Sequence, residues 1–538
     1  MPCYLALLLV ALPGLPFAAG LAARALGPGR ASRFTAAAAV AATLLAAIVA
    51  TLLSVYGSQT VRWAPFGEDA AFAGALRLDA VSAVMALLVS FLGMAVLGFS
   101  RNYLAGEPGQ ARFFSWMSLT LGSVLTLILS GQLLLLLASW AATSLCLHRL
   151  LLFYPERAGA AFAARKKFVF SRLGDACLLA AALVLYSHHR TFDLEAIFAH
   201  VARGNSGGVA TSAVLLAGCA ILKSAQFPFH SWLPDTMETP TPVSAFMHAG
   251  IVNAGGYLVV RLAPIFAAAP FASGLLALTG AFTAAFGAIV MLAQPSVKRA
   301  LAYSTIAQMG FMVLQCGLGA YALALLHIAA HSLYKAHAFL TSGSTIGAVP
   351  RAAVQLRTPA LTAGVLACGL MVALGATALH ALFPAAAFHP GLFGMLLALA
   401  LAYGVARAAS AGDGTRTTAR AFAAAAAIAA LRLCRHAGAS ALFSGLPVTP
   451  PPPALCAVVG AVFAGLFLFQ ALLWRANLHP AGRRFYVHAL NGFYVGILFN
   501  RLLGRLWPRQ TRPVRFVPPT TDVRPFHHAL PRESGRAW

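Results

Sequence analysis

The sequence predicts an all-α polytopic membrane protein with about 13–15 transmembrane helices. The first observation is composition: 60% of the 538 residues are hydrophobic and only 9% are charged. A soluble chain of this length could not cover its surface with so few polar groups. The second is the mean hydropathy of +0.79, carried by apolar segments of roughly 20 residues, the length that crosses a bilayer.

The apolar segments follow one another without an intervening soluble domain, so residues 1–474 are interpreted as one transmembrane domain. The first segment looks like a retained span rather than a cleaved signal peptide, although Pro13 and Pro16 interrupt it. The fourteenth is weak. The fifteen segments cover 3–23, 34–56, 78–99, 113–130, 132–153, 168–187, 209–226, 242–262, 272–293, 300–318, 319–345, 361–384, 389–408, 421–434 and 454–474.

The net charge of +25 would suit a nucleic-acid partner, but its distribution indicates membrane topology. Basic loops alternate with balanced ones, which is the positive-inside pattern. The N-terminus is therefore expected outside the cell, and the basic loops and the C-terminus in the cytoplasm. The basic loops hold Arg24, Arg30 and Arg33 and, after the fifth span, Arg157, Arg165, Lys166 and Lys167.

The end of the chain has a different character. Residues 475–508 mix aromatic residues and arginines at helical spacing. This pattern predicts an amphipathic helix on the cytoplasmic interface or against a partner protein, and a last, poorly marked span is the alternative. Residues 509–538 are polar, basic and proline-rich, which predicts a flexible tail.

Lysine is rare in this chain, which has 33 arginines and five lysines. A desolvated lysine can lose its proton, whereas a guanidinium effectively cannot. Lys223 and Lys335 fall inside apolar runs, where a charge costs roughly 2.5–3.5 kcal/mol. Both are therefore candidates for an ion pathway, while Lys298 beside Arg299 is explained by anchoring at a span end.

Four prolines follow Lys223 and predict a broken helix. They are Pro228, Pro234, Pro240 and Pro242. The backbone groups that prolines free are tolerated at membrane depth only beside protein or a water-filled cavity. Discontinuous helices with a polar residue at the break recur in ion pathways. The alternative is a cytoplasmic loop with Lys223 snorkelling to its edge.

A row of titratable residues marks residues 325–335. His327, His331 and Lys335 are spaced at i, i+4 and i+8, so they share one helical face. Histidine titrates near neutral pH, so such a row can relay protons. Helix–helix contacts by single histidines are the alternative. A haem or metal site is less well supported, because no facing His or Cys pair is visible.

Asp175 is one of two acidic residues at or inside a span, Asp79 being the other. It could tune a nearby lysine as a counter-charge, or it could pair with Arg172 three residues earlier. The eight cysteines form no CxxC pair and are interpreted as small apolar residues.

Four motifs resemble the proton-pumping antiporter-like subunits of respiratory complex I and of multisubunit cation/proton antiporters. They are FVFSRLGDACLL, KSAQFPFHSWLPDTMETPTPVSAFMHAGIVNAGGYL, SVKRALAYSTIAQMGFM and LHIAAHSLYKAHAFLTSGS, within residues 130–345. The resemblance implies two inverted five-helix repeats, each with a broken helix, and a hydrated polar axis. It implies that Lys223 is the central titrating lysine, that His248 lies in the next helix, that Asp175 belongs to the axis, and that the His327–Lys335 row leads to the second half.

The chain departs from that family pattern at two places. Ala141 stands where the family has a glutamate that pairs with the broken-helix lysine. Residues 361–434 contain no lysine, although the second broken helix of the family carries one. A long lateral helix at the C-terminus is also not evident. The outlet of the pump as the family builds it is therefore not expected here.

These departures are typical of one branch of the antiporter-like family. ATSLCLHRLLLFYPER, HSWLPDTMETPTPVSAFMHAGIVNAGGYLVVRLAP and FYVHALNGFY resemble the DabB family, the membrane subunits of the two-component DAB inorganic carbon system. The resemblance implies a bacterial inner membrane and a large cytoplasmic zinc partner, DabA. Ion flow, of protons rather than Na⁺, would energise CO2 hydration in that partner. The chain itself shows no zinc ligand set, so the enzymatic chemistry and the zinc are expected on the partner.

Two other functions are compatible with the sequence. The first is an antiporter-like subunit of NADH-quinone oxidoreductase or of a cation/proton antiporter, against which Ala141 and the missing second lysine argue. The second is a membrane anchor without transport, which would have no use for intramembrane lysines.

Overall fold

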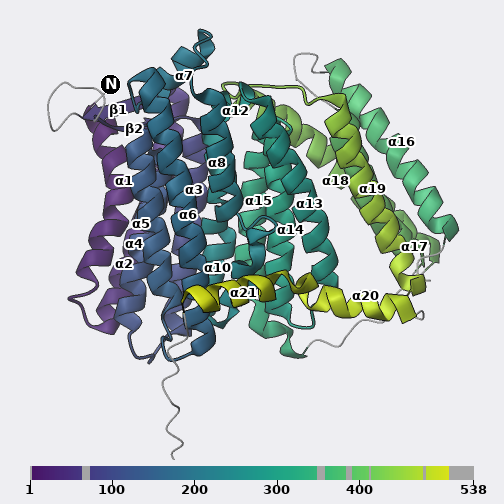
Figure 1. The fold of residues 1–538 in the computed structure, drawn as a ribbon, viewed down its shortest axis with the longest axis horizontal. Helices are drawn as coiled ribbons and strands as arrows, with labels where there is room; N and C mark the ends of the chain where they lie inside the picture. The colour runs from purple at the N-terminus through teal and green to yellow at the C-terminus, as the bar shows by residue number, and fades with distance from the viewer. Residues whose placement is uncertain are drawn as a thin grey trace, which may run out of the picture. The chain divides into compact units, whose positions relative to one another are not determined.

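The computed structural model describes residues 3–63, 73–347, 358–382, 390–410, 414–476 and 480–507. These residues fall into two units that divide after Gly496, and the description below concerns the first unit unless stated otherwise. Helices make up nearly all of it, which confirms the all-α polytopic class (Figure 1). Ten helices among the described residues are long and apolar enough to cross a membrane.

The helices of the first half are joined by short connections and by one small hairpin. Its strands β1 (Gln59–Trp63) and β2 (Gly74–Leu78) are antiparallel, with Gln59 opposite Leu78. The helices are α1 (Cys3–Ala22), α2 (Pro28–Tyr56), α3 (Ala80–Tyr103), α4 (Gln110–Leu129), α5 (Leu133–Leu151), α6 (Ala158–His189), α7 (Leu194–Ala202) and α8 (Val209–Lys223).

The middle of the chain is fragmented before long helices resume. The short pieces are η1 (Phe229–Ser231), α9 (Trp232–Asp235), η2 (Thr236–Glu238), α10 (Thr241–Ala249), η3 (Ile251–Asn253), α11 (Ala254–Arg261) and α12 (Ala263–Ala267). The long helices are α13 (Pro270–Ala293), α14 (Val297–Gly317), α15 (Tyr321–Leu340), α16 (Thr358–Leu382), α17 (Pro390–Ser410), α18 (Gly414–Leu442) and α19 (Pro453–Ala476), with η4 (Ser342–Gly347) after α15.

The bundle is ordered along the sequence. Figure 1 shows α1 to α6 together, α8, α10 and α13 to α15 in the middle, and α16 to α19 beyond them. Glycines bring α13 and α14 into close contact: a Cβ on Gly280 would collide with the backbone of Leu314, and one on Gly310 would lie 2.5 Å from the amide of Ala284. Small residues at such crossings let membrane helices pack backbone to backbone.

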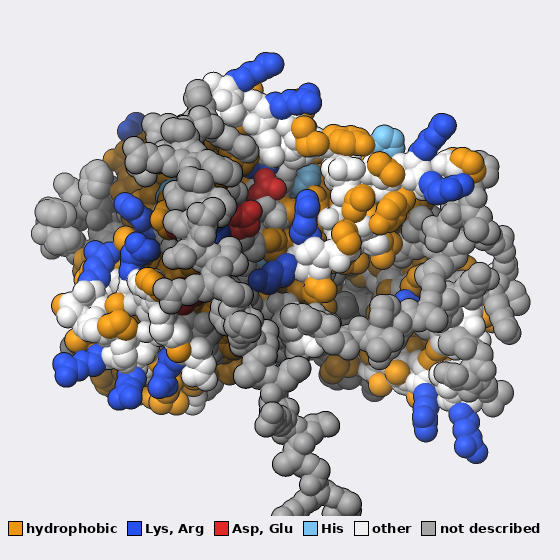
Figure 2. Space-filling model, turned by 90° about the horizontal axis from the view of Figure 1, so that it is seen from below, with side chains coloured by type: hydrophobic (Ala, Val, Ile, Leu, Met, Phe, Trp, Pro, Cys, Tyr) orange, Lys and Arg blue, Asp and Glu red, His pale blue; other side chains and the backbone are white. Residues whose placement is uncertain are grey.

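The basic residues gather at one end of the helices, opposite the end where α1 begins. The connections α1–α2, α5–α6 and α13–α14 all lie there, because successive spans alternate in direction. Figure 2 shows this face, where Lys and Arg side chains outnumber acidic ones. The geometry agrees with the charge pattern of the sequence, and the assignment of this end to the cytoplasm stays a prediction.

One expectation about this end is wrong. Lys166 and Lys167 were expected in the loop before the sixth span, but α6 begins at Ala158 and includes both residues. Their exposed fractions are only 2% and 3%. The apolar segment predicted from residue 168 thus missed the first ten residues of the helix, because its Ala and Arg content obscured the helical pattern.

The segment predicted to be amphipathic is helical where it is described. It contains α20 (Pro480–Leu490), η5 (Gly492–Tyr494) and α21 (Val495–Leu506), the last of which lies mainly in the second unit. The tail predicted for residues 509–538 lies outside the described residues. The division into two inverted five-helix repeats stays a prediction.

Candidate functional site

The helix that carries Lys223 breaks directly after it. Helix α8 ends at Lys223, Ala225 adopts a positive φ of 49°, and only short helical pieces follow until α10. The break lies inside protein, since every residue of α10 is buried. Protein groups satisfy the freed backbone: the amide of Phe227 donates to Oγ1 of Thr283 at 3.0 Å. This is the arrangement that the prolines predict.

The Lys223 side chain points into the protein rather than to its edge. Its exposed fraction is 6%, and its Nζ lies 4.5 Å from the centre of the Trp140 ring on α5. Among the described residues Nζ has no hydrogen-bond partner. The snorkelling alternative, which requires the amine to reach the surface, is therefore wrong. The aromatic face supplies part of the stabilisation that a buried ammonium needs.

Charged residues of α6 surround this lysine. Lys167 Nζ donates to both the carbonyl and the hydroxyl of Ser144 at 2.8 Å. Arg172 Nη2 lies 2.7 Å from Oδ2 of Asp175, so the pairing weighed for Asp175 is present. Asp175 also interacts electrostatically with Lys223. The Lys223 cluster, defined as Lys167, Arg172, Asp175, Lys223 and Trp140, thus holds three cations against one carboxylate.

A second cluster forms around His248 on α10, which is fully buried. His248 Nδ1 lies 3.1 Å from Oγ1 of Thr305 on α14, and this hydroxyl donates to the carbonyl of Leu301 at 3.0 Å. Lys335 Nζ donates to the same carbonyl at 3.0 Å. With the hydroxyl proton directed to Leu301, the tautomer that fits this geometry has Nδ1 of His248 as the donor to Thr305. A continuous hydrogen-bonded link therefore joins His248 to Lys335.

The histidine row on α15 continues from this cluster. The rings of His327 and His331 are 6.1 Å apart, and His331 faces the backbone of His248. His327 Nδ1 lies 2.9 Å from Gln315 Oε1, and its Nε2 lies 2.9 Å from Gln308 Oε1. Both ring nitrogens of His327 are therefore held by α14. We call His248, Thr305, His327, His331 and Lys335 the histidine cluster.

The structure thus groups the predicted site residues into two clusters. The first cluster is built on α5, α6 and α8, and the second on α10, α14 and α15. Sequence reasoning missed Lys167, Thr305 and the glutamines that hold His327. Lys167 had a usable signal, since it directly precedes a long apolar run, whereas a threonine or glutamine in a span carries no such signal.

The short pieces after the break are fastened to α6 by charge. Lys166 Nζ lies 2.9 Å from Oδ2 of Asp235. Arg157 Nη1 donates to the carbonyl of Glu238 at 3.3 Å. Such contacts hold the end of the break that faces the basic side of the bundle.

An aromatic series connects η5 to the same break. The ring of Phe493 lies 5.9 Å from that of Phe286, which lies 5.3 Å from Phe227 and 4.7 Å from His230. Gln294 Nε2 also donates to the carbonyl of Leu490 at 3.1 Å. Phe493 has a φ of 50° and Tyr494 one of 63°. Left-handed conformations of this kind are costly for non-glycine residues and persist only where packing enforces them.

A third charged group ties the helices together at the end where α1 begins. Arg261 Nη1 lies 2.6 Å from Oδ2 of Asp79, and Arg77 lies 3.0 Å from the same oxygen. Asp79 also caps α3, accepting from the amide of Ser82. Burial alone would raise the pKa of Asp79, but Arg261 and Arg77 outweigh it and hold the pKa below its usual range.

Within the described residues, no group of three His, Cys, Asp or Glu side chains is close enough to hold a metal ion. The six cysteines described in full are free thiols. That zinc resides on a partner stays a prediction.

Comparison with known proteins assigns the chain that carries these clusters to a family. The profile of the NADH:quinone oxidoreductase/Mrp antiporter transmembrane family matches residues 130–403, about half of the chain. The chain belongs to this antiporter-like family. A second profile, for the N-terminus of complex I chain 5, matches residues 63–114. Both clusters lie inside the first match.

Relatives of two kinds are similar to this antiporter-like chain. A "Probable inorganic carbon transporter subunit DabB" of Hydrogenovibrio crunogenus is 45% identical over 269 residues, 49% of this chain and 52% of the relative. DabB2 of Halothiobacillus neapolitanus is 43% identical over 311 residues, 56% of each chain. Chain 5 of the NAD(P)H-quinone oxidoreductase of Synechocystis is 40% identical over 296 residues, 54% of this chain and 43% of the relative. The chain thus spans about half the length of the curated relatives it matches.

Solved structures share the fold. The Mrp complex of Dietzia sp. matches 94% of this chain and 56% of its own with a TM-score of 0.58 and 25% identity. A chain of an archaeal membrane-bound sulfane sulfur reductase matches 92% of this chain and 99% of its own with a TM-score of 0.57 and 17% identity. The relatives are named as subunits, and this chain is a multi-pass membrane protein of the same family.

Proposed function

We propose that this chain is the ion-conducting membrane subunit of a two-component inorganic carbon uptake complex. Protons, rather than Na⁺, would enter down their gradient and reach Lys223 at the helix break. A large soluble zinc protein similar to DabA would use that flow to drive CO2 hydration. The likeness to the DabB subunits, by identity and by name, supports the assignment of the carbon substrate.

The observation that carries the ion-conducting role is the buried, unbonded amine of Lys223 at the break. A side chain that only anchored the helix would reach the surface, and a purely structural amine would be hydrogen-bonded. A lysine held beside an aromatic ring and one carboxylate can instead exchange a proton at modest cost. His248 and Lys335, which are both held at the carbonyl of Leu301, the first through Thr305 and the second directly, offer a second set of exchangeable groups.

The chain has no carboxylate at position 141. This fits a gate that passes one proton more closely than a pump that moves protons over a long range. Ala141 follows Trp140, whose ring centre lies 4.5 Å from the Lys223 amine. With one carboxylate shared among three cations, the charge of Lys223 depends strongly on burial. We infer that one proton passes through this lysine at a time.

The partner would dock on the basic side of the bundle, next to α20 and η5 of the first unit. The aromatic series from Phe493 through Phe286 to Phe227 gives a direct physical connection between η5 and the break. Movement of η5 on partner binding would therefore act on the backbone of Phe227, four residues from Lys223.

Replacement of Lys223 tests this function. Lys223→Ala is expected to abolish growth that depends on inorganic carbon uptake, whereas Arg299→Ala, which removes an exposed cation elsewhere, should leave growth intact. Membrane insertion is checked by immunoblot of both variants. Full growth of a correctly inserted Lys223→Ala strain would overturn the proposal.

Purification of the tagged chain from its own membranes tests the partner. A stoichiometric large soluble zinc protein in the eluate is expected. Flavin and iron–sulfur subunits would instead support the alternative function, a proton-pumping subunit of NADH-quinone oxidoreductase or of a cation/proton antiporter, which the family match and the fold of the Mrp complex favour. Uptake that is insensitive to uncouplers would support a membrane anchor without transport.

A further inference from the structure

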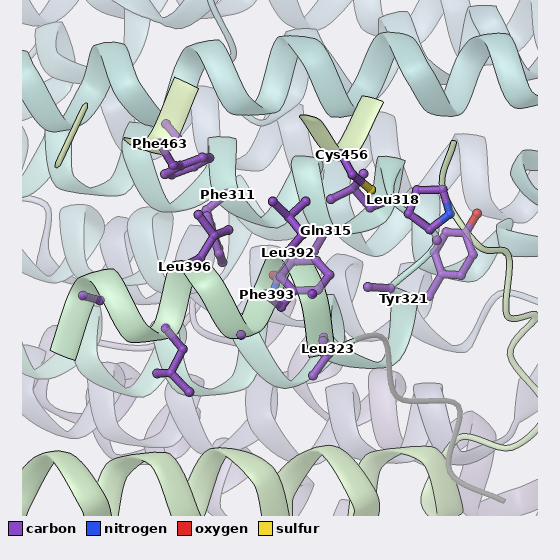
Figure 3. Close-up of a pocket in the computed structure, with 18 of the residues that line it drawn as sticks. Phe311, Gln315, Leu318, Tyr321, Leu323, Leu392, Phe393, Leu396, Cys456 and Phe463 are labelled. Atoms are coloured by element: carbon purple, nitrogen blue, oxygen red, sulfur yellow. The ribbon is translucent and has the colours of Figure 1, made fainter. Parts of the chain in front are cut away.

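A large elongated cavity lies beside the histidine cluster, between α14, α17 and α19 (Figure 3). Its volume is about 1090 Å³. Its lining residues run from Ala307 on α14 to the C-cap Leu318, and from Gly391 to Tyr403 on α17. At 1.5 Å per residue these stretches are about 16 Å and about 18 Å long. The cavity therefore extends along the helices, through more than half of a hydrocarbon core of roughly 30 Å.

The lining of the cavity is uncharged and mostly apolar. Figure 3 shows Phe311, Leu392, Leu396 and Phe463 on its walls. None of the lining residues is Asp, Glu, Lys, Arg or His, and the polar ones, such as Gln315, are neutral. Apolar cavities do not hold water well, and an empty one would deprive its walls of dispersion contacts. A large, mainly apolar occupant therefore fits this cavity best.

The surroundings identify the source of that occupant. Helices α17 and α19, which form two of the walls, are among the helices long and apolar enough to span a membrane. The bilayer supplies flexible apolar chains that run parallel to such helices. We propose that the cavity holds an acyl chain of a membrane phospholipid.

The acyl chain would seal one end of the histidine cluster. Gln308 and Gln315 line the cavity and also hold both ring nitrogens of His327. With the cavity filled by lipid, bulk water does not reach His327 from this side. The histidine cluster then exchanges protons towards His248 rather than into the cavity. This inference does not depend on the identity of the transported ion or of the partner.

Photolabelling of the full chain in membranes tests the proposal. A phospholipid with a diazirine in its acyl chain is expected to label Leu392 and Phe463 in the cavity, as well as Leu374 on the exposed surface of α16. Gly391 lines the cavity, and a Cβ there would meet nothing within 4 Å. Gly391→Trp should therefore fill the space and reduce cavity labelling several-fold while labelling of Leu374 is unchanged. Labelling of Leu374 alone in the unmodified protein would overturn the proposal.

A second measurement uses Cys456, a thiol that lines the cavity. A charged, membrane-impermeant thiol reagent should not modify Cys456 in native membranes, with Cys456→Ser reporting the background from other cysteines. Rapid modification would show a water-filled vestibule and overturn the lipid assignment. Removal of the photolabel by excess isoprenoid quinone, but not by excess phospholipid, would assign the site to a quinone instead.

Discussion

The hydroxyl of Thr305 is the only group that joins His248 to Lys335 through the carbonyl of Leu301 in the described part of the chain. Thr305→Val keeps the shape of the side chain and removes this hydroxyl. We expect ion-coupled uptake to fall sharply in this variant. Neither partner of the hydroxyl is changed, so the loss isolates the link itself.

The size of the expected loss of uptake in Thr305→Val depends on which groups lose a hydrogen-bond partner. Leu301 keeps Lys335 as a donor, so its carbonyl stays satisfied. His248 Nδ1 loses its acceptor at 3.1 Å while it is fully buried. A buried polar group left without a partner costs about 1–3 kcal/mol. If this cost falls on proton transfer, the rate drops by about 5-fold to 150-fold.

The assay is proton uptake by proteoliposomes containing the complex, followed with a pH-sensitive dye under an imposed gradient. Thr305→Ser, which keeps the hydroxyl, should stay close to the wild type. Thr35→Val is a matched control, because the buried hydroxyl of Thr35 bonds only carbonyls of its own helix. Wild-type rates in Thr305→Val, with unchanged thermal stability, would refute the role of the link.

The remaining predictions concern stability, measured as thermal unfolding in detergent. Asp79→Asn keeps a capping side chain but removes the ion pair with buried Arg261, so stability should fall by about 3–5 kcal/mol; the same change at Asp193, in a more exposed pair, should cost less than about 1 kcal/mol. Because the pKa of Asp79 lies below its usual value of about 3.9, the wild-type contribution is present above about pH 4 and is lost as the pH falls through the folded-state pKa. Asp79→Asn should remove that part of the acid sensitivity, and an unchanged acid profile would contradict the assignment. Gly280→Ala should prevent close packing of α13 and α14 and lower the yield of folded protein. Gly404→Ala is the control, because a Cβ there meets nothing within 4 Å, and it should be neutral or stabilising by up to about 1 kcal/mol. Equal behaviour of the two variants would disprove the packing argument.

The sequence predicted those parts of the site that depend on order along one helix. Prolines after Lys223 break the chain by local geometry, and the structure has the break there. The spacing of His327, His331 and Lys335 fixes one helical face, and the adjacent histidine rings lie 6.1 Å apart. Periodicity and steric rules act within a few residues, which is why the sequence alone conveys them.

The partners of these residues were decided only by the tertiary structure. Thr305 meets His248 across 57 residues, and Asp79 meets Arg261 across 182. Nothing local marks such pairs, because they depend on which helices pack together and at what depth. The same holds for Lys167, whose place inside α6 followed from where that helix begins.

The sequence by itself determined that the chain is an all-α membrane protein with a broken helix at Lys223, since apolar length and proline geometry are local properties. Only the packing of the helices decided that this lysine rests on Trp140, that a threonine links the histidine cluster, and that an apolar cavity adjoins it. Contacts and cavities arise between helices, and backbone approach at glycines such as Gly280 sets their geometry. The sequence of a single helix does not specify which helix packs against it.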